Sequence, residues 1–141
     1  MVIRRHRLTL TTTAPIAFVD LSDDLRAWVR TAGVRDGLLT VTSPHTTARI
    51  NCNEREPQLQ RDMLRFLQRL APQDAEYGHN HDTVDGRANA HSHLLGLLMP
   101  ATETIPVVDG ELSLGHWQSV FFVELDGPRE KREVLLQLIG E

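Results

Sequence analysis

Apolar and polar residues alternate along the first part of the chain, from Ile3 to Thr13, and this period of two predicts a strand with one solvated face. Beyond it, apolar residues recur at helical spacing between Ser22 and Gly33. The Ser22 hydroxyl suits an N-cap and Gly33 suits the end of a helix, so the pattern predicts a helix of about three turns.

Two short apolar runs, 37–43 and 48–53, predict a pair of buried strands, and the segment between them places His45 on their connection. Pro57 is well placed as the first residue of a second helix, because the N–H that proline lacks would have no hydrogen-bond partner within the helix at that position. One apolar stripe supports that helix: Leu59, Met63, Phe66, Leu67 and Leu70.

The second half of the chain predicts a functional loop, a third helix and a set of late strands. The polar segment 73–87 is long for a connection, which is typical of a site loop. Asn89 is expected to cap a third helix that runs to about Met99. The late strand signals are a hairpin over 107–112 with the turn pair Asp109-Gly110, then strands at 117–125 and 132–139.

The order of these elements predicts the fold class. About seven strands and two or three helices do not alternate as they do in a parallel α/β fold. We therefore expect an α+β fold with a mostly antiparallel, sandwich-like core. A length of 141 residues without a linker predicts a single domain over 1–141.

Composition and charge limit the classes of partner that we expect for the protein. The net charge of -4 and the pI near 5.9 disfavour nucleic acid, since the arginines are scattered and form no basic block. The single cysteine, Cys52, cannot form an internal disulfide, and the N-terminal residues lack the apolar core of a signal peptide. No apolar run reaches the roughly 20 residues of a membrane helix. We expect a cytoplasmic protein that contacts neither a membrane nor nucleic acid.

Histidines are the most distinctive candidates for chemistry, because five of the seven lie between His79 and His116. His45, His79 and His93, with Glu54, have the side-chain types that bind zinc and related metals. Capping or surface roles explain such histidines equally well. On a helix, residues two apart diverge by about 200°, so at most one of His91 and His93 faces a given site.

A second group of candidates lies in the segment 110–129. Trp117, Gln118, Asp126 and Arg129 fit a polar site, in which Arg129 meets an anion. The structural alternative is that Trp117 fills a sheet face, Gln118 ties down a turn and Arg129 pairs with an acidic side chain at the surface.

Several reaction classes are disfavoured by missing motifs. The chain has neither a GxxxxGK[ST] loop nor a GxGxxG segment, so the usual backbone cradles for nucleotide phosphates are missing. It also lacks GxSxG, and Cys52 lies mid-strand, where a cysteine is usually a small apolar residue and not a nucleophile.

Taken together, the motifs from about Val41 to the C-terminus resemble the YjbQ family, a widespread group of small proteins often named secondary thiamine-phosphate synthase. The strings that carry the resemblance are Ser43–Ala48 with His45, Asn53-Glu54, Glu56-Pro57, Tyr77 with His79, Asn89-Ala90 with His93, Gly110–Gln118 and Glu124–Arg129. The chain departs from the family pattern at His116, where a Thr is usual, and through the additional His81 and His91.

The resemblance implies an α+β, sandwich-like homotrimer with its shared polar residues in a pocket near subunit contacts. It also implies a weak thiamine-phosphate synthase activity that joins a pyrimidine diphosphate to a thiazole phosphate, a transferase acting on phosphorylated small molecules. The assignments that follow are Glu54, His45 and Arg129 as catalytic, Asn89, Trp117, Gln118 and Asp126 as substrate-binding, and His45, His79 and His93 as ligands of a divalent metal, zinc or magnesium.

Two other interpretations stay open. In one, a non-catalytic trimer uses the same cluster to bind a metabolite or small anion. In the other, the histidines and the Asp-Arg pairs hold a structural interface between subunits.

Overall fold

The structure, a computed structural model, describes residues 1–141 as eight strands, three α-helices and one short 3-10 helix, η1. In chain order these are β1 (Val2–Thr12), β2 (Ala17–Asp20), α1 (Ser22–Ala32), β3 (Gly37–Thr42), β4 (Ala48–Glu54), α2 (Pro57–Leu70), η1 (Gly78–His81), α3 (Ala90–Gly96), β5 (Thr102–Val108), β6 (Glu111–Leu112), β7 (Gln118–Glu124) and β8 (Arg129–Gly140). All strand pairs are antiparallel, which confirms the predicted α+β class.

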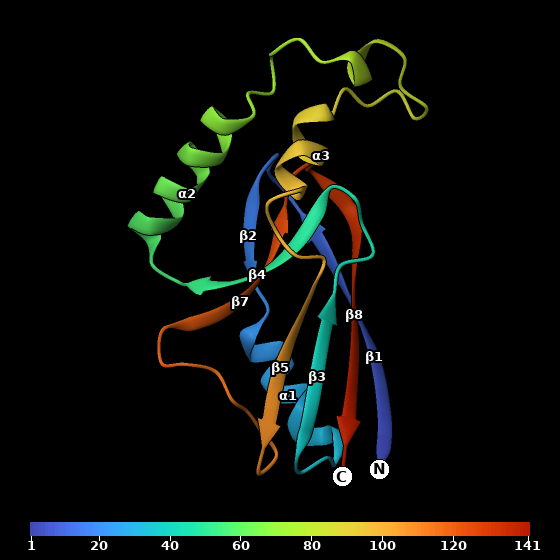
Figure 1. The fold of residues 1–141 in the computed structure, drawn as a ribbon, viewed down its shortest axis with the longest axis vertical. Helices are drawn as coiled ribbons and strands as arrows, with labels where there is room; N and C mark the ends of the chain where they lie inside the picture. Colours follow the sequence, from blue (N-terminus) through green and yellow to red (C-terminus); the bar gives the residue numbers. More distant parts are fainter.

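Two sheets face each other across the main core (Figure 1). The larger sheet has the order β1-β8-β3-β5-β6 and the smaller one β2-β7-β4. Alternate residues of each strand point inward, as the period of two requires. α1 adds Leu25 and Val29 to this core, and Leu21, the residue before the helix, adds a third side chain. The main core residues from the strands are Leu39, Val41, Ala48, Ile50, Ile105, Val107, Val120, Phe122, Val134, Leu136 and Leu138.

The smaller sheet is covered on its other face as well. Phe121 and Val123 of β7, and Leu125 just after it, form a second core with Leu95 of α3 and with Leu67 near the end of α2. The rest of α2 stands away from the sheets in Figure 1, and Leu67 is the one fully buried residue along it. The predicted apolar stripe of α2 is therefore only partly covered within the chain.

Four predicted elements differ in detail from the structure. β2 was not expected, because four residues are too few to establish a period. The segment 73–87 contains η1. The third helix ends at Gly96 and not near Met99, and the strand before the Asp109-Gly110 turn begins at Thr102 and includes Pro106.

Positive φ angles at Asp109 and Gly110, 50° and 79°, confirm the predicted hairpin turn between β5 and β6. Gly33, with φ of 68°, ends α1 as predicted.

Two predicted helix caps have other partners. Ser22 is the first residue of α1, and its Oγ accepts a hydrogen bond from the Val120 main-chain N–H at 2.9 Å, so it ties the helix to β7. Asn89 precedes α3 without capping it, because its amide contacts His79 and Asp126 instead. In both cases a long-range partner outcompetes the local one.

Several of the elements that carry candidate side chains meet at one end of the molecule. Figure 1 shows the β3–β4 connection, the loop before α3 and α3 itself at the end opposite the two termini. None of the three helices is long and apolar enough to span a membrane.

Candidate functional site

A cavity of about 390 Å³, which we call the histidine cleft, lies where the β3–β4 connection, the loop before α3 and the start of β8 come together. Its lining is mostly polar: Pro44, His45, Thr46, Thr47, His79, Val84, Asp85, Asn89, His93, Arg129 and Arg132. Five of the predicted site residues are among these: His45, His79, Asn89, His93 and Arg129.

The His45 ring is held by the main chain of β8. Its Nε2 accepts a hydrogen bond from the Glu133 N–H at 2.9 Å. A neutral imidazole carries one proton, so the proton must lie on Nδ1, which therefore faces any ligand as a donor. Burial first, and then the charge of Arg132, lower the pKa of His45 and favour this neutral form.

Arg132 is a buried cation at the edge of the cleft. Its Nε and Nη2 contact the Glu124 carboxylate at 2.9 and 2.6 Å, and Nη2 also donates to Thr47 Oγ1 at 2.9 Å. Its Nη1 donates to no atom of the chain. The main-chain N–H groups of Thr46 and Thr47 are likewise without a partner in the chain. These groups add further donors to the cleft.

Asp126 organises the cationic side of the cleft. Its carboxylate accepts hydrogen bonds from Arg87, from Arg129 and from the Asn89 amide at 2.7 to 3.0 Å. Burial alone raises the pKa of Asp126, but the bonds from Arg87, Asn89 and Arg129 outweigh it and lower that pKa to about 2. Arg129 is anchored through Nε and Nη2, so its Nη1 remains free.

His79 and His93 form an edge-to-face pair with ring centroids 5.1 Å apart. Because the Asn89 Nδ2 donates to Asp126, the Asn89 Oδ1 must be the acceptor that faces His79 Nε2 at 3.1 Å. His79 Nδ1 has no hydrogen-bond partner in the chain.

His93 lines the cleft, while His91, two residues earlier on α3, is buried beside Ser92 and lines another cavity. This matches the divergence expected for residues two apart on a helix.

Three predicted site residues lie elsewhere in the chain. Glu54 pairs with Gln118 at the far end of β4, six residues from Ala48, or about 20 Å at the usual rise of a strand. The Gln118 Oε1 accepts from the Gly115 N–H at 2.8 Å, as in the structural alternative. Trp117 is 69% exposed, packs edge-on against His116 and fills no sheet face.

The donor set of one chain does not fit a protein cage for a metal. No three side chains among its histidines, cysteines and acidic residues gather around one point. His45 Nε2 is occupied by Glu133, and His79 and His93 alone supply two nitrogens. The metal assignment of these histidines stays a prediction.

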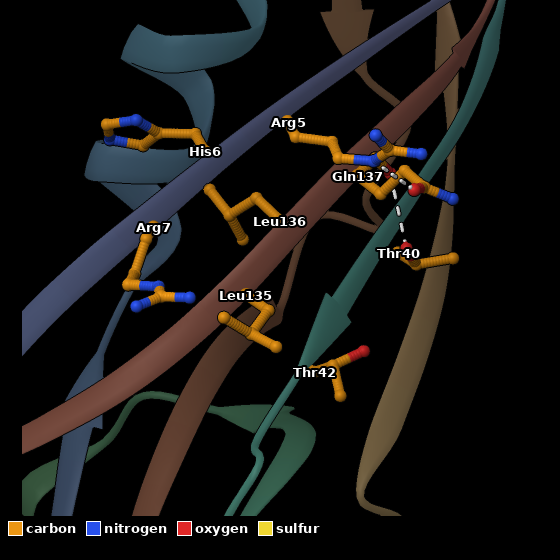
Figure 2. Close-up of a pocket in the computed structure, with 8 residues that line it drawn as sticks. All are labelled: Arg5, His6, Arg7, Thr40, Thr42, Leu135, Leu136 and Gln137. Atoms are coloured by element: carbon orange, nitrogen blue, oxygen red, sulfur yellow. Dashed lines mark hydrogen bonds between the residues drawn. The ribbon is translucent and has the colours of Figure 1, made fainter.

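A larger hollow, of about 590 Å³, lies on the outer face of the five-stranded sheet (Figure 2). Figure 2 shows that Arg5 donates a hydrogen bond to the side-chain oxygen of Gln137, and that Thr40 donates one to the main-chain carbonyl of the same residue. His6 points away toward α1. Other polar side chains of this hollow have partners outside the set drawn, since Arg7 bonds to Glu133 and Thr42 to Thr102. We prefer the histidine cleft as the functional site, because its donors converge and several lack partners.

The sequence analysis missed Arg87, Thr47 and Arg132. Arg132 did leave a signal, because it occupies an inward position on β8, in phase with Val134 and Leu136. A charged residue in a core-facing position requires a partner, and so marks a buried network. Arg87 lies in an irregular loop, where no period could indicate its direction.

Comparisons with known proteins cover nearly the whole chain. The sequence profile of the family described as UPF0047 protein YjbQ-like matches residues 6–141. A UPF0047 protein of Methanothermobacter thermautotrophicus is 39% identical over 94% of this chain and 90% of its own length. The UPF0047 protein YugU of Bacillus subtilis is 31% identical over 94% of this chain and 97% of its own.

Solved structures agree with these relatives. A YbjQ-like protein of unknown function from Sulfolobus solfataricus P2 superposes with a TM-score of 0.93 at 31% identity, covering 99% of both chains. A hypothetical protein from Aeropyrum pernix K1 gives 0.89 at 39% identity, covering 98% of this chain and 99% of the other.

Proposed function

Since the chain belongs to the YjbQ-like UPF0047 family and its cleft presents free hydrogen-bond donors, we propose that it binds the phosphate groups of a small molecule and acts on that molecule as a transferase. The reaction we propose is of the thiamine-phosphate synthase type. The homotrimer expected of the family belongs to the same proposal.

One observation carries the phosphate-binding part. The His45 ring accepts from Glu133 at Nε2 and so keeps its N–H donor free, in a cleft that is also lined by Arg129 and Arg132, whose Nη1 groups are free. Charged donors that converge in a partly buried cleft bind phosphate oxygens strongly. A metal would require lone pairs at His45, which this arrangement does not offer.

The proposed chemistry places these donors on the leaving group. The ring nitrogen of a thiazole phosphate forms a C–N bond to the methylene carbon of a pyrimidine diphosphate, while the C–O bond breaks and the diphosphate departs with the electron pair. Arg129, Arg132 and the His45 N–H would stabilise the negative charge on that diphosphate. Asp126 and Asn89 act as positioning residues, because they hold Arg129 and His79.

A non-catalytic anion-binding protein is the second candidate, and one feature favours it. Within one chain the cleft offers no free buried carboxylate as a base: Asp126 is held by three donors, Glu54 lies at the other end of β4, and Asp85, which does line the cleft, is exposed. Glu54, Trp117 and Gln118 remain predicted site residues whose substitution the same assays would test.

Calorimetry with inorganic diphosphate tests the binding proposal. Arg129→Met should weaken binding about 10- to 100-fold, the range for one charged hydrogen bond. Arg26→Met, an exposed arginine on α1, is the matched control and should change nothing. If Arg129→Met lowers only thermal stability and leaves diphosphate binding intact, Arg129 is structural and the assignment fails.

A turnover assay then separates the two candidates. Release of pyrophosphate from the pyrimidine diphosphate, with appearance of thiamine phosphate, supports the transferase. Tight diphosphate binding without turnover supports the binding protein.

The metal prediction has its own test. Elemental analysis of the purified protein beside a His93→Ala variant, with melts before and after chelation, should show a stoichiometric divalent ion lost in the variant if these histidines bind one. Equal metal content in both proteins would contradict that assignment.

A further inference from the structure

Two cavities continue the histidine cleft on the side of His79 and His93. The first, of about 440 Å³, shares both histidines with the cleft and adds Tyr77, Ala90 and Leu94. The second, of about 270 Å³, shares Tyr77 and Leu94 with the first. Its other lining residues are all apolar: Leu70, Ala71, Leu95, Leu97 and Leu98. Because neighbouring cavities share lining residues, we treat the three as one groove that runs from a polar end to an apolar end.

The apolar part of the groove has almost nothing to offer a polar ring. The Tyr77 hydroxyl donates to the Pro72 carbonyl at 2.9 Å, so it has no proton left to donate to a ring nitrogen. The remaining polar side chains along these two cavities are the histidines at the boundary with the cleft. A pyrimidine ring placed here would bury nitrogen atoms without hydrogen-bond partners, which is unfavourable. A hydrocarbon has no such requirement.

The leucines along the groove are exposed in this chain. Leu94 is 44% exposed, Leu98 61% and Leu97 78%. Contiguous apolar side chains that face water are typical of a surface that binds something apolar. The groove leads from them directly to the donors of the cleft, so a single ligand with an anionic head and an apolar chain matches both ends.

We infer that the ligand is a phosphate or diphosphate monoester of a hydrocarbon alcohol, of alkyl or prenyl type, with its phosphate in the histidine cleft and its chain along Tyr77 and Leu94. This inference rests on the proposed phosphate binding in the cleft. It keeps the phosphate-binding part of the proposed function and replaces the pyrimidine substrate named there, because the organic group recognised is a chain and not a heteroaromatic ring.

The test is a calorimetric series of methyl, butyl and hexyl phosphate, with hydroxymethylpyrimidine phosphate for comparison. Hexyl phosphate should bind at least about tenfold more tightly than methyl phosphate, since each fully buried methylene group contributes up to about fourfold. Leu94→Asn should abolish this dependence on chain length and leave the affinity for methyl phosphate unchanged. Leu38→Asn, an exposed leucine of β3 at 52%, is the matched control.

Several outcomes would overturn the inference. One is an affinity that does not depend on chain length, and another is tighter binding of the pyrimidine phosphate than of hexyl phosphate. A third is a Leu97→Glu variant that changes the molecular mass in solution and keeps the dependence on chain length, which would mean that a second copy covers these leucines. If inorganic diphosphate itself does not bind, the phosphate-binding proposal fails first, and the two failures are thereby distinguished.

Discussion

The Glu133 main-chain N–H occupies Nε2 of His45, and this single bond decides what the side chain can offer a ligand. Imidazole is a donor at one nitrogen and an acceptor at the other when neutral, so fixing one fixes both. The same logic assigns Asn89 and His79, because the Asp126 carboxylate accepts only. At the scale of residues, these hydrogen bonds decide which donors stay free, and free donors favour an anionic ligand more directly than the residue types do.

We expect nitrogen-15 NMR to find the His45 proton on Nδ1 and a titration midpoint below 6.5, since burial and Arg132 lower its pKa. The unfolded state binds the proton more readily than the folded state. Protonation of His45 therefore lowers the free energy of unfolding as pH falls from 6.5 toward the folded pKa, and above 6.5 it has no effect. His45→Phe should remove that pH dependence. A proton found on Nε2 would contradict the donor role and restore His45 as a metal ligand.

The Asp126 carboxylate should stabilise the fold in a defined pH window. Its pKa falls from 3.8 to about 2 on folding, which corresponds to about 2 kcal/mol at neutral pH. A depressed pKa gives stability that is complete above the unfolded pKa and is lost as pH falls through the folded one. The stability difference between the protein and Asp126→Asn, measured by urea unfolding, should therefore shrink between about pH 4 and pH 2. A difference that stays constant over this range would show that the carboxylate charge is not what stabilises the turn.

At the scale of elements, the turn between β7 and β8 positions both Asp126 and Arg129. Gly127 lies within it so close to the Ala14 carbonyl that an added Cβ would overlap that oxygen. The Gly127 N–H also donates to the Pro15 carbonyl at 3.0 Å. The turn is thereby fixed to the segment that connects β1 with β2.

We expect Gly127→Ala to lower the free energy of unfolding by about 1–3 kcal/mol, since the backbone must move to admit the methyl group. Diphosphate binding should weaken too, because the displaced turn carries Arg129. The control is Gly78→Ala, whose Cβ meets no atom within 4 Å and should leave stability nearly unchanged. Urea unfolding and calorimetry measure the two effects, and a fully stable Gly127→Ala protein would refute the argument.

Elements with their own local signals could be predicted from the sequence. Pro57 begins α2, Gly33 ends α1, and the Asp109-Gly110 pair forms its hairpin turn, because each of these depends on a few neighbouring residues. Features that depend on distant partners could not be predicted. The Ser22 hydroxyl bonds to β7 and the Asn89 amide to Asp126, so their capping roles gave way to long-range contacts.

For the site, the sequence suggested candidate residues but could not establish which of them lie together in the fold. His45, His79, Asn89, His93 and Arg129 line one cleft although they span the chain from the β3–β4 connection to β8. The motif that contains Trp117 and Gln118 looked continuous with Asp126 and Arg129 in sequence. A strand of about 20 Å separates them in space, because β7 runs the length of the smaller sheet.

At the scale of the whole molecule, the two sheets are joined at the cleft by one buried ion pair. Arg132 comes from β8 of the larger sheet and Glu124 from β7 of the smaller one, and their side chains are 5% and 0% exposed. Thr12, at the end of β1, donates to the same carboxylate at 2.8 Å. Burial raises the pKa of Glu124, but its hydrogen bonds, from Arg132 above all, outweigh burial and lower it.

This pair has a structural role and, in the proposed function, a binding role, and one substitution cannot separate the two. Arg132→Met leaves the Glu124 charge buried without its partner, so the free energy of unfolding should fall by about 3–5 kcal/mol. Adding Glu124→Gln removes that charge, and its one amide oxygen can still accept from the main-chain N–H groups of Leu125 and Asp126 while its NH2 donates to the Thr12 hydroxyl oxygen. The second substitution should therefore recover most of the lost stability. Diphosphate binding should stay weak in the double variant, because the Arg132 Nη1 donor is still missing. Binding that returns together with stability would instead show that Arg132 only joins the sheets, and that the anion is held by His45 and Arg129 without it.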